Sequence, residues 1–390
     1  MQNQNSYIYY VGFYSKADNP NKFRIFPATN TKMDYIVSAV KEAGFKISIF
    51  ALGEAQTTKW SFFKRKLIKI DEHEKITYVS TFGAFVSINK FLSRLWLLLQ
   101  LFFFLSFEVK KSSTVIYYHS FATLGVVRLS KFFNNYRLVY EVEEIFQAAW
   151  QGTDKKIKNE INSLKNADAY IFVNDLFASK CGFTEKPSVV CYGDYRIINT
   201  NKPIYKSNEV INIVYAGVIG TSDSDVYLAI NTMNFLPNNY VLHLLGYGTA
   251  VDIVEMELTI KGMNDFFGFV KILFHGRLSG NEYTNFLRNC QIGLSTRVLQ
   301  NKYSDYTFPS KVLVYLCNNL VTVSSPISCI TQSKIASNIF FYELSTPESV
   351  CKKILSLKSS DYAKTNNDSI RRLNDNFIKD LKIILNADSR

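Results

Sequence analysis

The sequence predicts an α/β protein of two doubly wound domains that face each other across a cleft. Its 390 residues are enough for two or three domains. In both halves, short runs of β-branched and aromatic residues alternate with helical segments, as in parallel βαβ units. A polar stretch with a proline, residues 199–210, separates the halves. Ligands of such paired sheets bind at the carboxyl ends of the strands, which predicts an enzyme with its site in the cleft.

The N-terminal half begins with a strand at residues 7–14 (YIYYVGFY). Apolar residues at helical spacing predict a helix over 32–43, and Gly44 ends it. Further strands are expected at 45–52, 113–120, 137–144 and 168–175.

The C-terminal half repeats this alternation, starting with a strand at 211–220 and a helix at 224–235. No helical pattern is clear after residue 248. The other predicted strands are 240–248, 270–279, 291–298 and 320–325, and the other helices are 281–289, 309–317, 346–356 and 366–386. We therefore expect domains at 1–205 and 206–360, with 361–390 as a C-terminal helix able to return to the first domain.

Composition narrows the class of protein. The chain is 47% hydrophobic and 20% charged, which excludes a disordered chain and a polytopic membrane protein. Its net charge is +12, and residues 1–200 carry 26 basic against 17 acidic side chains, so most of the excess lies in the N-terminal half. The six cysteines show no CxxC spacing and no signal peptide is evident, so we expect a reducing, cytoplasmic location.

Two segments raise the question of a membrane. Residues 95–105 (LWLLLQLFFFL) are almost wholly apolar but too short to span a bilayer, which leaves a buried core helix or an interfacial helix. Residues 59–69 (KWSFFKRKLIK) mix aromatic and basic side chains, a composition suited to anionic lipid. With Lys110 and Lys111, they predict a membrane-facing edge on the N-terminal half, at the inner face of the plasma membrane.

Residues 303–325 hold the most informative motif. Pro309 suits the first turn of a helix, and Thr307 and Ser304 are potential caps. The backbone N–H groups of Ser310 and Lys311, with the lysine ammonium, would form an anion site for a diphosphate. The alternative is a capped helix with a solvated lysine.

In its motifs the sequence resembles the retaining glycosyltransferases of the GT-B fold, particularly bacterial enzymes of the glycosyltransferase 4 (group 1) type that build capsule and O-antigen polysaccharides. The resembling segments, in the order of that family, are VYAGVIG (214–220), LHLLGYG (242–248), ILFHGRLSGNEYTNFLRNCQIGL (272–294) and FPSKVLVYLCNNLVTVSS (308–325). YYVGFY, IYYHS and VYEVEEIF resemble the N-terminal domain more loosely.

The resemblance implies that the C-terminal domain holds a nucleotide-sugar donor. Ser310 and Lys311 resemble the diphosphate-binding helix start, while Gly276 and Arg277 resemble the loop beside the donor base. A surface arginine is the alternative for Arg277. The other implied donor-binding positions are Gly217, Gly246, Gly248 and Tyr306.

Catalytic candidates lie in the N-terminal half. His119 ends the apolar strand STVIYYHS (113–120), and a histidine near such a strand end contacts the donor sugar in the family; a structural histidine is the alternative. Strand alternation puts Glu141 and Glu143 on one face and Glu144 at the loop, where a carboxylate could orient an acceptor hydroxyl or cap a helix.

Two departures from the family stand out. Its glutamates spaced eight apart correspond to Tyr306 and Val314 here, and its basic pair after the first strand of the second domain is absent. Asp305 or the Tyr306 hydroxyl could substitute in part. These departures make a catalytically inactive GT-B partner or scaffold protein of a glycosyltransferase complex the main alternative.

The leading hypothesis is transfer of a sugar from a nucleotide-sugar to a glycan or polyprenyl-linked acceptor in surface polysaccharide biosynthesis. It requires no cofactor, and the scattered histidines and cysteines predict no metal site. Nucleic-acid binding rests on net charge alone, so no nucleic-acid partner is expected. A dinucleotide-dependent dehydrogenase is disfavoured because the GxG at 246–248 stands without a third glycine.

Overall fold

The computed structural model describes residues 7–16, 18–24, 27–57, 61–83, 87–197, 210–220, 225–297 and 305–386. The chain divides into two compact units. Unit 1 comprises Met1–Gly193 and Asp375–Arg390, and unit 2 comprises Asp194–Asn374. The predicted boundary at residue 205 and nearly all of the predicted linker lie outside the described residues.

Unit 1 is built on an eight-stranded sheet in the order β10-β9-β8-β7-β1-β2-β5-β4, parallel except for the antiparallel edge strand β4. Its central strands are buried almost throughout, which is why they are continuous apolar and aromatic runs in the sequence. The strands are β1 (Tyr7–Gly12), β2 (Lys46–Ala51), β4 (Lys66–Lys69), β5 (Glu74–Tyr78), β7 (Thr114–Tyr118), β8 (Arg137–Val142), β9 (Ala169–Phe172) and β10 (Ser188–Val190).

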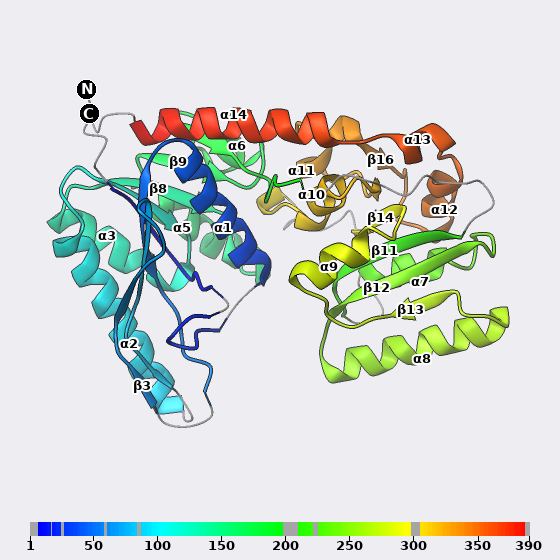
Figure 1. The fold of residues 1–390 in the computed structure, drawn as a ribbon, viewed down its shortest axis with the longest axis horizontal. Helices are drawn as coiled ribbons and strands as arrows, with labels where there is room; N and C mark the ends of the chain where they lie inside the picture. Colours follow the sequence, from blue (N-terminus) through cyan, green and yellow to red (C-terminus); the bar gives the residue numbers. More distant parts are fainter. Residues whose placement is uncertain are drawn as a thin grey trace. The chain divides into compact units, whose positions relative to one another are not determined.

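Helices cover both faces of this sheet. The connection from β1 to β2 runs in one direction across the sheet, and the connection from β7 to β8 runs in the other. Because both crossovers are right-handed, their helices α1 (Pro27–Glu42) and α3 (Leu124–Phe133) lie on opposite faces of the sheet (Figure 1). Helix α3 packs against α2 (Ser87–Phe103) and the π-helical turn η1 (Phe104–Glu108). Shorter elements are η2 (Phe121–Thr123), α4 (Phe146–Ala149), α5 (Asp154–Leu164) and α6 (Phe177–Cys181).

The basic segment 59–69 contains two strands that the sequence analysis does not predict. β3 (Ser61–Phe63) pairs with β6 (Thr81–Gly83), and β4 pairs with β5, both antiparallel. The exposed side of these short edge strands is rich in lysine, a composition that discourages edge-to-edge pairing as well as suiting a lipid surface. Lys59 and Trp60 lie outside the described residues.

Unit 2 has a six-stranded, wholly parallel sheet in the order β13-β12-β11-β14-β15-β16. Its strands are β11 (Ile211–Val218), β12 (Tyr240–Tyr247), β13 (Ile272–Phe274), β14 (Ile292–Ser295), β15 (Val321–Ser324) and β16 (Ile339–Phe341). Its helices are α7 (Asp225–Thr232), α8 (Ala250–Phe267), α9 (Gly280–Leu287), α10 (Ser310–Cys317), α11 (Ser328–Thr331), η4 (Ala336–Asn338), α12 (Pro347–Leu355) and α13 (Ser359–Ala363). This doubly wound order confirms the predicted α/β fold class.

The longest helix of unit 2 before the C-terminus, α8, was not expected. It shows no amphipathic pattern because its exposed side is also apolar: Val251, Val254 and Leu258 are 75%, 55% and 65% exposed. Only Met256 and Ile260 of this helix are buried. A periodicity search cannot detect a helix whose two faces have similar hydropathy.

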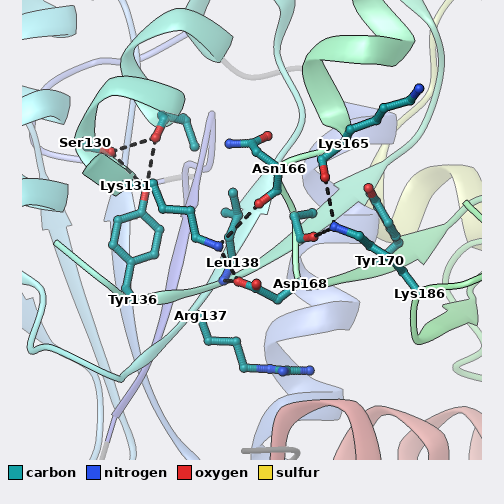
Figure 2. Close-up of polar contacts among 12 residues, drawn as sticks. Ser130, Lys131, Tyr136, Arg137, Leu138, Lys165, Asn166, Asp168, Tyr170 and Lys186 are labelled. Atoms are coloured by element: carbon teal, nitrogen blue, oxygen red, sulfur yellow. Dashed lines mark hydrogen bonds and ion pairs between the residues drawn. The ribbon is translucent and has the colours of Figure 1, made fainter. Parts of the chain in front are cut away.

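The C-terminal helix α14 (Asn367–Asn386) has its last residues in unit 1. There Phe377 packs against Tyr35, and the buried Arg137 donates from Nη2 to the carbonyl of Ile384 at 2.9 Å. Figure 2 shows Arg137 at the start of β8, beside Asp168, whose Oδ2 accepts from Lys131 Nζ at 2.5 Å and from the Leu138 amide at 2.7 Å. These contacts at the amino ends of β8 and β9 hold α3 and α14 to the sheet.

Candidate ligand-binding site

The strand order of unit 2 reverses between β11 and β14. The chain proceeds outward from β11 through β12 and β13, then returns to the other side of β11 for β14. Open parallel sheets bind ligands at such a reversal, outside the carboxyl ends of the strands. Gly217 near the end of β11, Arg297 after β14 and Lys311 at the start of α10 are associated with this end of the sheet. It is the candidate site of unit 2.

Lys311 places its ammonium here. The Nζ atom lies 3.9 Å from the centroid of the Tyr215 ring, and a Cβ added to Gly217 would come within 3.0 Å of it. Burial lowers the pKa of Lys311 to about 8, opposed by the negative charge of Asp225 and aided by the positive charge of Arg297. The side chain is therefore still mostly protonated at pH 7 in a site where an incoming anion would stabilise it further.

The start of α10 differs in detail from the expectation. Pro309 is the N-cap residue and not within the first turn, and its own side chain makes no capping hydrogen bond. Ser310 is exposed and Lys311 half-buried in the first turn, whose free N–H groups suit an anion. Tyr306 and Asp305 are half-buried just before the helix, and Ser304 lies outside the described residues.

Gly246 and Gly248 are required by the sheet itself, whereas a Cβ at Gly217 would meet only the side chains of Lys311 and Tyr215. A Cβ at Gly246 would overlap the carbonyl oxygen of Gly217, and a Cβ at Gly248 would overlap that of Ile219. Strands β11 and β12 thus approach closely at their carboxyl ends. This close approach explains why both positions are glycine, and contact of these glycines with a nucleotide stays a prediction.

Gly276 and Arg277 follow the neighbouring strand β13. Gly276 has φ +70°, a left-handed conformation that favours glycine, and its carbonyl accepts from the Gly246 amide at 2.9 Å. The exposed guanidinium of Arg277 lies 5.4 Å from the centroid of the Tyr247 ring, which is 56% exposed. Arg277 and Tyr247 therefore form a cation and aromatic pair that is open to solvent at the carboxyl end of β12, and such a pair suits a flat ring system.

Unit 1 holds a different cluster at the carboxyl end of β8. Lys32 Nζ of α1 lies 2.5 Å from Glu143 Oε1 and donates to the Cys191 carbonyl at 2.6 Å. The fully buried Glu141 accepts from the Tyr10 hydroxyl at 2.7 Å. As expected from strand alternation, both glutamates act on the same lysine.

Burial raises the pKa of both carboxyls in this cluster. Burial, with the nearby charge of Glu143, raises the pKa of Glu141 to about 8 against the opposing effect of Lys32. The pKa of Glu143 is also raised by burial, and Lys32 opposes that shift too. Lys32 thus favours the ionised form of both carboxyls, while burial favours their protonated form. Glu143, 21% exposed, is the member that a ligand could reach.

Sequence analysis did not identify Lys32 or Tyr10. Lys32 lies one turn before Ile36 on a buried side of α1. A lysine on an otherwise apolar helix face was the one sequence feature that could have indicated a buried partner for it. Its partner lies more than one hundred residues away, which no local pattern reveals.

His119 and Glu144 are neighbours of this cluster but differ from it in setting: the His119 amide donates to the Glu141 carbonyl at 2.8 Å, and Glu144 follows Glu143 in the chain. His119 directly follows β7 and is 2% exposed, and burial lowers its pKa to about 4, so its imidazole is neutral at pH 7. Its Nε2 lies 3.3 Å from Glu160 Oε1, and its ring packs on Phe146. Glu160 also accepts from the Phe146 and Gln147 amides, which ties α4 to α5. This burial favours the structural alternative for His119; Glu144 is half-buried.

Comparison with known proteins places the fold. No family model and no curated protein matches the sequence. Among solved structures, apo OtsA matches 99% of this chain and 100% of its own, with a TM-score of 0.68 at 12% identity.

Two further structures were solved with ligands. A trehalose-6-phosphate protein from E. coli bound with UDP-2-fluoro glucose has a TM-score of 0.66 at 12% identity, over 97% of this chain and 99% of that one. HepE from Anabaena in complex with UDP and glucose has a TM-score of 0.62 at 12% identity, over 96% and 98%. The chain therefore has the GT-B type of two-domain fold.

Proposed function

We propose that the protein is a glycosyltransferase that moves a sugar from a nucleoside diphosphate donor to a glycan acceptor. The carrying observation is the Lys311 ammonium beside Gly217, at the reversal point of a sheet whose fold is shared with proteins bound to UDP-sugars. The lysine and the first N–H groups of α10 would bind the diphosphate and stabilise it as it leaves. Arg277 and Tyr247 would lie along the base.

In this proposal unit 1 binds the acceptor. Glu143 is the reachable carboxylate of its cluster and would accept a hydrogen bond from an acceptor hydroxyl, with the charge of Lys32 favouring its ionised form. We propose a lipid-linked glycan of the capsule or O-antigen type as acceptor, because α2, η1 and α3 expose apolar side chains on the same unit. Retention of the anomeric configuration follows from the family resemblance.

The proposal is tested by titrating the protein with UDP, other nucleoside diphosphates and their sugars in a thermal-shift assay. A ligand that binds only the folded state raises the unfolding temperature. We expect a shift with at least one nucleoside diphosphate, lost in Lys311→Ala. No shift with any of them would contradict the proposal.

One observation favours the second candidate, a non-catalytic partner of a glycosyltransferase. Tyr306 and Val314 stand where the resembling family has its two glutamates. Donor turnover separates the two hypotheses: release of nucleoside diphosphate with either glucose 6-phosphate or a lipid-linked glycan as acceptor supports the enzyme. Nucleotide binding with no turnover on either acceptor supports the partner.

A further inference from the structure

The helix formed by α2 and η1 is apolar on both sides. One side packs into unit 1, where Leu97, Leu101, Phe104 and Leu105 are nearly or fully buried and Phe104 stacks on Phe50 at 3.8 Å. The opposite side is exposed and carries large apolar side chains. Their exposed fractions are 67% for Phe91, 46% for Leu95, 41% for Leu99, 55% for Phe103 and 66% for Phe107.

Helix α3 continues this exposed surface. Leu129, Phe132 and Phe133 are 53%, 86% and 52% exposed, and the Phe133 ring contacts Phe102 of α2 edge to face at 5.5 Å. Two polar side chains of α3 turn toward the sheet instead: Ser130 pairs with Tyr136, and Lys131 with Asp168 (Figure 2). A helix on a water-exposed surface normally has the reverse arrangement. We call Leu99, Phe103, Phe107, Leu129, Phe132 and Phe133 the aromatic face.

Basic side chains border the aromatic face. Lys110 and Lys111 follow η1 after Val109, and Arg128 lies one turn before Phe132 on α3; all three are exposed. The acidic residue at the end of η1, Glu108, is neutralised by Arg65, which donates to both carboxylate oxygens at 2.6 Å. The border is therefore positively charged.

We propose that the aromatic face docks on an anionic lipid bilayer, with its rings among the acyl chains and its basic border against the headgroups. Aromatic side chains framed by lysine and arginine match the apolar boundary and negative surface of such a membrane. An 18-residue window, Phe91–Glu108, is long and apolar enough to span a bilayer by length and composition, longer than the sequence analysis expected. The buried Leu101 and Leu105 belong to the core of unit 1, so this helix lies on the membrane.

A second apolar helix supplies a contrast. On α8 of unit 2, Val254, Leu258 and Phe266 are 55%, 65% and 83% exposed, but the exposed neighbours include Glu255 and Glu257. An acidic border repels anionic lipid, so α8 serves as the matched control. Docking deepens the proposed function by giving unit 1 access to a lipid-linked acceptor, although binding to lipid needs neither donor nor transfer.

The experiment is vesicle flotation of the full chain with phosphatidylcholine alone and with 30% phosphatidylglycerol added. We expect flotation with the anionic vesicles, at least tenfold less with neutral ones, and weakening in 1 M salt. The triple variant Phe103→Ser, Phe107→Ser, Phe132→Ser should lose flotation. The triple variant Val254→Ser, Leu258→Ser, Phe266→Ser should float as the parent does. Lys110→Glu, Lys111→Glu, Arg128→Glu should lose the preference for anionic vesicles.

Equal flotation of the parent and the first triple variant would overturn the proposal. So would protein that resists extraction from vesicles at alkaline pH, since it would span the bilayer, or a lipid-free dimer abolished by the same variant, since a second copy would then cover the face. Circular dichroism confirms that each variant is folded. A failed nucleotide thermal shift leaves these measurements unaffected, so docking and the proposed transfer fail separately.

Discussion

The two units share a doubly wound sheet but carry opposite chemistry at the carboxyl ends of their strands. Unit 1 buries two carboxyls, Glu141 and Glu143, around one lysine. Unit 2 presents the cations Lys311 and Arg297 with Asp225 near them. The same strand winding thus supports a carboxylate suited to a hydroxyl in one unit and an ammonium suited to a phosphate in the other. Topology sets the place of a site, and the side chains after each strand set its ligand.

The largest effect is expected from removing the cation of the unit 1 cluster. Lys32→Met leaves two buried carboxyls without their counter-charge and should lower the free energy of unfolding by about 3 kcal/mol at pH 8. The loss should shrink at pH 5, because the raised pKa values of both carboxyls favour their neutral forms as pH falls. Urea unfolding at the two pH values measures it, with Lys69→Met on the exposed edge strand as control. Equal, small losses in both variants would show that the cluster is not held by this lysine.

Removing the cation of unit 2 should affect ligand binding and not stability. Lys311→Ala should weaken nucleoside diphosphate binding roughly 10- to 100-fold, as expected when a charged hydrogen-bond donor is lost. In the parent, affinity should fall as pH rises through about 8, because the ammonium then loses its proton. Calorimetric titration tests both, and Lys261→Ala on α8 controls for net charge. Unchanged affinity would place the anion site elsewhere.

The proton held by unit 1 predicts a pH dependence of stability. The pKa of Glu141 is raised to about 8 in the folded state, so its proton stabilises the fold at low pH and this contribution is lost as pH rises from about 4.5 to 8. The slope is at most about 1.4 kcal/mol per pH unit. Glu141→Gln keeps an acceptor for Tyr10 but cannot ionise, so its unfolding free energy should fall less over this range. Parallel pH profiles would contradict the assignment.

The smallest effect is expected at the edge of the unit 2 site. Arg277→Ala should weaken binding of a nucleoside diphosphate about 2- to 5-fold, the scale of an exposed cation and aromatic pair. Pyrophosphate, which lacks a base, should bind equally well to parent and variant. Equal weakening of both ligands would mean that Arg277 contacts phosphate and not the base.

Much of the fold was predictable because buried parallel strands leave a strong local pattern. Runs such as YIYYVG and INIVYAGV are apolar along their length, and each became a central strand, β1 and β11. The failures have equally local causes. Helix α8 is apolar on its exposed side, and β3, β4 and β6 are short strands outside the centre of the sheet whose pairing depends on the chain around them.

The candidate site was predictable in part for the same reason. Lys311 was found because a helix start after a proline is a local signal of free N–H groups. Lys32 was not, because its partners Glu143 and Cys191 are distant in sequence and come together only when α1 packs on the sheet. His119 was placed at the end of a strand, one residue from the observed end of β7, but its burial, which leaves it neutral, could not be inferred from that position.

By itself, the sequence determined the α/β class, the central strands and the lysine at the start of α10, because these depend on the spacing of neighbouring residues. Only the tertiary structure decided which charges meet. It paired Lys32 with Glu143, set Lys311 over Tyr215, and joined α2 to α3 in the aromatic face. The reason is that the burial of a charge and the contact of two surfaces depend on residues far apart in the chain, which packing alone brings together.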